Sequence, residues 1–161
     1  MFIGKLNKYV MKKGLLLLVI CILGVHVYAG DIDESRVPRM VKESVKKAYP
    51  EAARVKWDFE EDENVYEAEF EIGDLEYKLE ITPEGKIVYS KEDITIESIP
   101  PVIKEYLAKE YAGYKIMGAN KIMKKGVVKY DVGIVGKNSY GHKRRYNIHF
   151  DAEGKVMRDK N

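Results

Sequence analysis

The sequence predicts an α+β fold in which a helix followed by a four-stranded antiparallel sheet occurs twice in tandem, with the helices on one face and the opposite sheet face exposed. Two pairs of similar segments support this prediction. "ITPEGKIV" at residues 81–88 and "FDAEGKVM" at 150–157 place the same Glu-Gly-Lys turn between apolar residues. "RVPRMVKESVKKAYPEA" at 36–52 and "SIPPVIKEYLAKEYAGY" at 98–114 share proline and apolar positions. Repetition of this kind indicates two copies of one supersecondary unit.

Each copy begins with an expected helix. Pro38 or Pro100 stands at its start, where the missing N–H of proline costs little. Apolar residues then recur at helical spacing, namely Val41, Val45 and Tyr49 in the first copy and Ile103, Leu107 and Tyr111 in the second. Pro50 is expected to end the first helix and Gly113 the second.

Four strands are expected after each helix. In the first copy they run over about 55–59, 65–72, 75–81 and 87–94. Apolar and charged residues alternate along the first three, and the fourth follows the Glu-Gly-Lys turn. Alternation with period two is typical of an antiparallel sheet that has one face on a core and one face in water. The residues expected to pack beneath the helices are Trp57, Tyr66, Phe70, Tyr77, Leu79, Tyr130, Ile148 and Phe150.

The chain is expected to divide into a signal peptide at 1–29, a first repeat at 30–98 and a second repeat at 99–161. Lys12 and Lys13 precede an apolar run, and Ala29 provides a small residue for cleavage. The run is shorter than the roughly 20 apolar residues of a spanning helix. The mature form is therefore predicted to be periplasmic or secreted, without a membrane span. An uncleaved anchor is the alternative, and a lipid on Cys21 is disfavoured because the large Ile20 precedes it.

Charge is distributed unevenly along the mature chain. Residues 30–98 contain 20 Asp or Glu and 10 Lys or Arg, whereas residues 99–161 contain 6 and 14. The near balance of the whole argues against nucleic-acid binding. Two interpretations of the asymmetry are open: a binding face with two signs of charge, or simple solvation helped by attraction between the halves.

The residue pattern contains no catalytic signature, and no enzyme activity, cofactor or metal is expected. Cys21 is the only cysteine and lies in the leader, so the mature chain has no thiolate nucleophile. Zinc catalysis usually needs three protein ligands, and His142 and His149 are the only mature histidines. Carboxylates spaced along a strand diverge, whereas calcium loops need oxygens that converge.

Several motifs together resemble a known family. "VP" before a helix, then "AYPEAARVKW", "VYEAEF" and "PEGKIV", look like the PepSY-like family of small secreted proteins, which is associated with the fold of the beta-lactamase inhibitory protein. The resemblance covers about residues 36–160. It implies an exported binding or inhibitory scaffold and carries over no catalytic residue. The second copy departs from the pattern, because Ala112-Gly113 replaces Tyr-Pro and no tryptophan matches Trp57.

The loop "GKNSYGHKRR" at 136–145 is the best candidate contact for recognition, because the equivalent turn in the first copy is only Gly73-Asp74. The alternative is a surface loop without a binding role. Loops on a rigid scaffold often contact ligands. The expected function is therefore an exported, non-catalytic binding or inhibitory protein that holds a protein or peptide partner on its exposed sheet face and this loop. The candidate partner-binding residues are Glu67, Glu69, Glu71, Lys129, Asp131, Asn138, Tyr140, Arg145 and His149. The alternatives are a structural or chaperone-like component of the cell envelope and a periplasmic enzyme.

Overall fold

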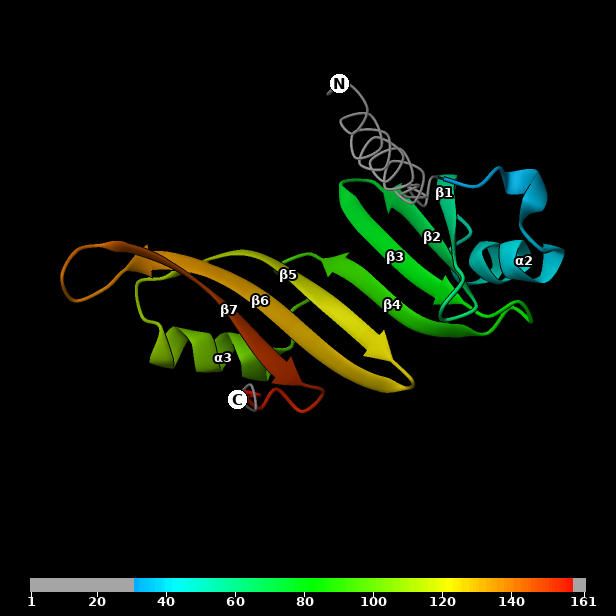
Figure 1. Cartoon of the computed structure of the whole chain (residues 1–161). Helices are drawn as coiled ribbons and strands as arrows, with labels where there is room; N and C mark the ends of the chain where they lie inside the picture. Colours follow the sequence, from blue (N-terminus) through cyan, green and yellow to red (C-terminus); the bar gives the residue numbers. More distant parts are fainter. Residues whose placement is uncertain (1–30, 158–161) are drawn as a thin grey trace, which may run out of the picture. The chain divides into compact units, whose positions relative to one another are not determined.

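Seven antiparallel strands form one sheet in the order β1 to β7, and two helices pack against it (Figure 1). The structure, a computed structural model, describes residues 31–157. Its elements in chain order are η1 (Glu34–Arg36), α2 (Arg39–Ala48), β1 (Ala53–Glu60), β2 (Val65–Ile72), β3 (Leu75–Ile81), β4 (Ile87–Ile94), α3 (Pro101–Glu110), β5 (Lys115–Lys124), β6 (Val127–Lys137) and β7 (Lys143–Asp151).

The predicted tandem repeat of a helix and a four-stranded sheet is wrong. The first strand after α3 pairs with β4 along its length, from Tyr89 opposite Lys124 to Ile94 opposite Ala119. The second half also contributes three strands, because after β7 only Val156 forms an isolated bridge, with Phe150. Pairing β4 with β5 satisfies backbone groups that two separate sheets would leave open at their edges. Alternation along a strand cannot reveal this choice, since the pattern is the same in one sheet or two.

Both helices cover the same face of the sheet. Tyr77 is opposite Glu92, and the register continues through Lys121 and Tyr130 to Phe150, so these five residues share one face. Tyr77 packs against the cluster under α2, and Phe150 belongs to the cluster under α3. We call this side the helix face and the opposite side the open face.

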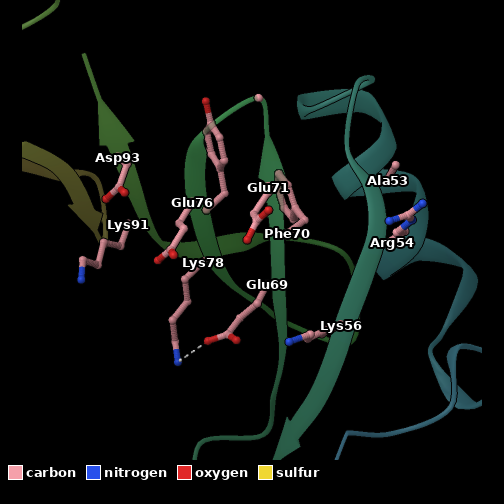
Figure 2. Close-up of a pocket in the computed structure, with 12 residues that line it drawn as sticks. Ala53, Arg54, Lys56, Glu69, Phe70, Glu71, Glu76, Lys78, Lys91 and Asp93 are labelled. Carbon is pink, nitrogen blue, oxygen red and sulfur yellow. Dashed lines mark hydrogen bonds and ion pairs between the residues drawn. The ribbon is translucent and has the colours of Figure 1, made fainter.

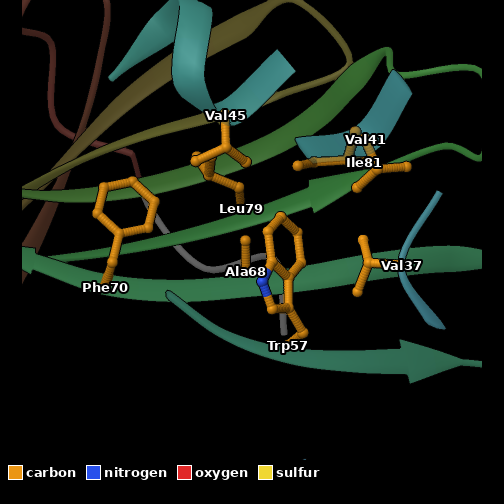
Figure 3. Close-up of a cluster of buried hydrophobic side chains, with 8 residues drawn as sticks. All are labelled: Val37, Val41, Val45, Trp57, Ala68, Phe70, Leu79 and Ile81. Atoms are coloured by element: carbon orange, nitrogen blue, oxygen red, sulfur yellow. The ribbon is translucent and has the colours of Figure 1, made fainter. Parts of the chain in front are cut away.

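Two hydrophobic clusters fill the space between the helices and the sheet. The first joins α2 to β1, β2 and β3 through Val37, Val41, Val45, Trp57, Ala68, Phe70, Leu79 and Ile81 (Figure 3). The second joins α3 to β5, β6 and β7 through Ile99, Ile103, Leu107, Ala119, Val132, Ile134, Ile148 and Phe150. Of the predicted core residues, five are buried, and Tyr66, Tyr77 and Tyr130 are half-buried against these clusters.

The repeated Glu-Gly-Lys turn packs its glycine against a helix in both halves. Gly85 has φ +83°, and a Cβ there would lie 2.8 Å from the Met40 carbonyl oxygen. The Ser44 hydroxyl also donates a hydrogen bond to the Gly85 carbonyl at 2.6 Å. Gly154 has φ +80°, and a Cβ there would overlap the Val102 side chain. Both turns therefore need glycine for backbone conformation and for the close approach of the helix.

The predicted signal peptide at residues 1–29 lies outside the described residues. Within residues 31–157, neither helix has the length and apolar character needed to cross a membrane. The predicted division of the mature chain at residues 30–98 and 99–161 stays a prediction.

Trp57→Ala should lower the free energy of unfolding by roughly 3–5 kcal/mol, because the indole is buried in the first cluster. Trp57→Phe is the matched control. It keeps a large apolar ring and removes an indole N–H that has no hydrogen-bond partner among the described residues, so it should cost clearly less. Urea unfolding followed by circular dichroism measures both. A cost of less than about 1 kcal/mol for the alanine variant would show that the site is not a packed core.

Gly85→Ala should destabilise the protein more than Gly73→Ala. Both glycines have positive φ, which costs a side-chain-bearing residue about 1–2 kcal/mol. A Cβ at Gly73 meets nothing within 4 Å, whereas one at Gly85 meets the backbone of α2. The difference between the two variants in chemical denaturation therefore isolates the contact between turn and helix. Equal costs would mean that only backbone conformation requires Gly85.

Candidate functional site

No described element covers the open face, and its side chains lie in rows that cross the strands. One row runs from β1 to β7 as Lys56, Glu69, Lys78, Lys91, Ile122, Lys129 and Asp151. A neighbouring row contains Asp93, Asn120, Asp131 and His149. Directly opposed residues on one face of an antiparallel sheet are close enough to interact. The open face is therefore a continuous surface of charged side chains.

Lys78 is the centre of an ion-pair cluster in the acidic half. Its ammonium lies 2.5 Å from Glu67 Oε1. It also lies 3.5 Å from Glu69 Oε1, the contact drawn in Figure 2. Burial raises the pKa of Glu67 above its ordinary value, although the hydrogen bond and charge of Lys78 oppose the shift. Burial alone would lower the pKa of Lys78, but its hydrogen bond to Glu67 and the charges of both glutamates outweigh that effect and raise it. The carboxylates of Glu67 and Glu69 are thus already paired with Lys78 within the protein.

A second polar pair lies on β6 and β7. His149 Nδ1 is 2.5 Å from Asp131 Oδ1, and both side chains are partly exposed. Asn120 is the neighbour of Asp131 on β5, and its Oδ1 is buried without a hydrogen-bond partner among the described residues. Within residues 31–157, no three His, Cys, Asp or Glu side chains gather as a metal site would require.

A cleft of about 720 Å³ lies at the β1–β4 end of the sheet. Side chains of both charges line it, including Glu69, Glu71, Glu76, Lys78, Lys91 and Asp93, which project from three neighbouring strands (Figure 2). Sequence reasoning proposed Glu69 and Glu71 but missed Glu76, Lys91 and Asp93. The alternation of residues 75–81 was the available signal for Glu76, whereas residues 87–94 do not alternate and gave no signal for Lys91 or Asp93.

The β6–β7 loop is organised by Asn138. Its Oδ1 accepts hydrogen bonds from the backbone N–H of Tyr140 at 3.1 Å and of His142 at 3.0 Å. Its backbone N–H also donates to the His142 carbonyl. These contacts leave Tyr140 82% exposed at the tip. Asn138, proposed as a contact residue, therefore shapes the loop, and Tyr140 remains available to a partner.

Four cations surround this loop: Lys137, Lys143, Arg144 and Arg145, which we call the basic hairpin. In the described part of the chain, none of them forms an ion pair. Lys78 differs from these four residues, because its charge is already compensated by two glutamates.

The proposed site residues share one face but do not form one cluster. Strand pairing places Glu67, Glu69, Glu71, Lys129, Asp131, Arg145 and His149 on the open face. The glutamates are on β2, whereas the other four are on β6 and β7. Four strand spacings separate β2 from β6, about 20 Å. A partner that touches both groups must therefore be at least the size of a small folded domain or a long peptide.

Two glycines expose bare backbone at the β5–β6 part of the open face. Gly118 and Gly133 are opposite one another, and neither has positive φ. A Cβ at Gly118 would meet nothing within 4 Å, and one at Gly133 only approaches Asn147. Gly136 on the same strand is different, because the ring of Tyr114 occupies the space of its Cβ. Packing against Tyr114 thus explains Gly136, whereas neither positive φ nor packing requires glycine at the other two positions.

Comparison with known proteins shows the fold. No protein-family model matches the chain, and no curated protein matches it either. Among solved structures, a DUF2874 family protein from Bacteroides uniformis is 26% identical, with a TM-score of 0.56 over 75% of this chain and 86% of that one. A BLIP-like protein from Bacteroides fragilis is 15% identical, with a TM-score of 0.56 over 76% and 85%. The chain has this BLIP-like fold, as the resemblance to the beta-lactamase inhibitory protein implied.

A third similar structure bears on location. It comes from Bacteroides eggerthii, is described as "putative periplasmic proteins", and is 23% identical with a TM-score of 0.55 over 76% of this chain and 86% of that one. The predicted location outside the cytoplasm agrees with that description.

Lys78→Met should raise the pKa of Glu67 further, because a partly buried carboxylate then loses its ammonium partner. A carboxyl whose pKa is raised by folding stabilises the fold only below its ordinary pKa, and this contribution is lost as pH rises through the folded value. The variant should therefore lose more stability at pH 7 than at pH 4. Urea unfolding at both pH values and NMR titration of Glu67 measure this.

The double variant Lys78→Met with Glu67→Gln is the control, since it removes the titrating group and should abolish the extra loss at pH 7. An unchanged Glu67 titration in the single variant would show that the ion pair has no influence on this carboxyl.

Proposed function

We propose that the chain is an exported, non-catalytic binding or inhibitory protein that holds a protein or peptide partner against its open face and β6–β7 loop. The observation that carries this proposal is one continuous sheet face that no described element covers. An antiparallel sheet can leave one face in water, but this face also adjoins an exposed tyrosine and an uncompensated basic hairpin.

Gly118 and Gly133 support the proposal independently of charge. Glycine inside a strand weakens it by roughly 0.5–1 kcal/mol relative to alanine, and it often marks a place where a ligand or another backbone approaches closely. Nothing in the described fold occupies the space above Gly118. The register shift between Ile116 and Gly118 also accounts for a glycine at 118, so the open space there permits a partner to lie on the β5–β6 backbone without requiring one, and Gly133 is the position that the fold leaves unexplained.

Two finer assignments belong to the same proposal. The order of the motifs supports membership of the PepSY-like family, and the basic and apolar residues before Ala29 support cleavage of a leader. The BLIP-like fold supports a role in protein binding, because the same architecture accommodates the exposed sheet face that the proposal requires.

Open-face variants should weaken binding of a partner isolated with the mature protein. Tyr140→Ala should reduce the free energy of binding by about 1 kcal/mol or more if the ring is buried in the partner.

Glu69→Lys should chiefly slow association at low salt, and the effect should shrink as salt screens it. Gly118→Val should weaken binding, because the valine side chain would keep the partner away from the β5 backbone. The free energy of unfolding should stay unchanged or rise, since valine favours strands and the space above Gly118 is open. Surface plasmon resonance and urea unfolding measure these effects.

Lys46→Glu is the matched control, because Lys46 is exposed on α2, away from the open face. It should change binding little. If Lys46→Glu abolishes binding while the Tyr140, Glu69 and Gly118 variants bind like the unmodified protein, the partner docks on the helix face and the proposal is wrong.

A further inference from the structure

The seven-stranded sheet has two edges, and the β1 edge is protected within the chain. The N–H of Ile32 donates to the Trp57 carbonyl at 2.7 Å, and the Asp58 carboxylate accepts the N–H of Phe59 at 2.7 Å. Arg54 has φ +56°, and the register shifts between Ala53 and Lys56, so the strand is bulged where it begins. Bulges and local hydrogen bonds of this kind prevent another strand from pairing with an edge.

The β7 edge is protected at only one end. The N–H of Met157 donates to the His149 carbonyl at 2.8 Å, which shows that the backbone groups of His149 point away from β6. Alternate residues of an antiparallel strand point the same way. The N–H and C=O of Arg145 and Asn147 therefore also point outward, and no described residue pairs with them. The stretch from Lys143 to Asn147 thus offers a regular open edge.

The side chains along this open edge specify the charge of what it accepts. Lys143, Arg145 and Asn147 project on the open face, while Arg144 and the 41% exposed Tyr146 project on the helix face. The three cations have no carboxylate partner in the described part of the chain. A second copy pairing its own β7 here would oppose like charges, which destabilises a strand pair. An acidic strand at this edge would be attracted by Lys143 and Arg145 on the open face and by Arg144 on the helix face.

We infer that the β7 edge between Lys143 and Asn147 binds an extended acidic segment of a protein partner as an eighth strand. The segment hydrogen-bonds to the outward groups of Arg145 and Asn147, its carboxylates pair with the basic hairpin, and an apolar residue packs on Tyr146. Backbone pairing provides affinity and the alternate side chains provide selectivity in this mode of recognition. The inference rests on the proposed binding function and adds the chemical class of the partner and its point of attachment.

A direct test uses an acetylated seven-residue peptide of alternating Glu and Val, titrated into the full mature protein and followed by NMR. Binding should protect the amide protons of Arg145 and Asn147 from exchange, which a purely electrostatic contact would not do. The same peptide with Lys in place of Glu should bind at least about tenfold more weakly, because repulsion replaces pairing. No protection of these two amides, or equal binding of both peptides, would overturn the inference.

Two variants of one residue separate the backbone from the charge. Arg145→Gln keeps the outward N–H and should weaken the Glu peptide only about two- to fivefold at low salt, with less effect at high salt. Arg145→Pro also removes the N–H, which an edge strand tolerates, and should abolish the protection at Asn147. A Glu peptide N-methylated at alternate residues tests the same hydrogen bonds with the protein unchanged, and it should fail to bind. Equal binding of the methylated peptide would overturn strand addition.

The outcomes distinguish this inference from the proposed function. If the Glu peptide protects Arg145 and Asn147 but open-face variants leave a partner's binding unchanged, the edge binds strands and the open-face proposal is wrong. If open-face variants weaken the partner and the peptide does not protect the edge, the open face binds without an added strand, and the inference is wrong.

Discussion

Pairing of β4 with β5 is the interaction on which the rest of the structure depends. Six opposed residue pairs, from Tyr89 with Lys124 to Ile94 with Ala119, join the strands on either side of α3. Without this pairing, two small sheets would each expose one more edge of unpaired backbone. With it, the two helices lie on the same side, and the opposite side becomes one continuous surface. The acidic strands β2 and β3 and the basic hairpin then belong to one face, which neither half could provide alone.

Each helix is fixed to this sheet by contacts of two kinds. Apolar side chains such as Val41 and Ile103 are fully buried between helix and sheet, and a glycine turn lies against the start of each helix. In the first half a polar contact is added, because the Tyr49 hydroxyl after α2 donates to Glu92 on β4 at 2.7 Å. Burial and the nearby Glu92 raise the pKa of Tyr49, so the hydroxyl keeps the proton that this bond needs. The repeated Glu-Gly-Lys turn thus has a structural explanation in both halves, because each of its glycines lies directly against a helix.

The sequence predicted local structure well and strand pairing poorly, for a physical reason. Proline positions and apolar spacing located both helices, and the Glu-Gly-Lys turn located the start of β4. Alternation located β2 and β3 and assigned Glu69 and Arg145 to the open face. Alternation describes one strand at a time, so it could not show that β4 pairs with β5 or that the second half has three strands. Alternation also could not identify Gly118 and Gly133 as open-face positions, because glycine has no side chain that is either apolar or polar.

The two ends of the open face differ in the sign of their uncompensated charge, and under the proposed function this difference would set the order in which a partner makes its contacts. Lys78 is already paired with Glu67 and Glu69, whereas Glu71, Glu76 and Asp93 form no ion pair among the described residues, so the first half presents a net acidic surface. The basic hairpin has no internal partner among the described residues, and its charges act on approaching molecules without competition. Uncompensated charge governs the rate and orientation of encounter, whereas desolvated contacts govern the lifetime of a complex. If the inferred acidic segment binds, it should therefore meet the hairpin and the β7 edge before the rest of the partner contacts the bare backbone of Gly118 and Gly133.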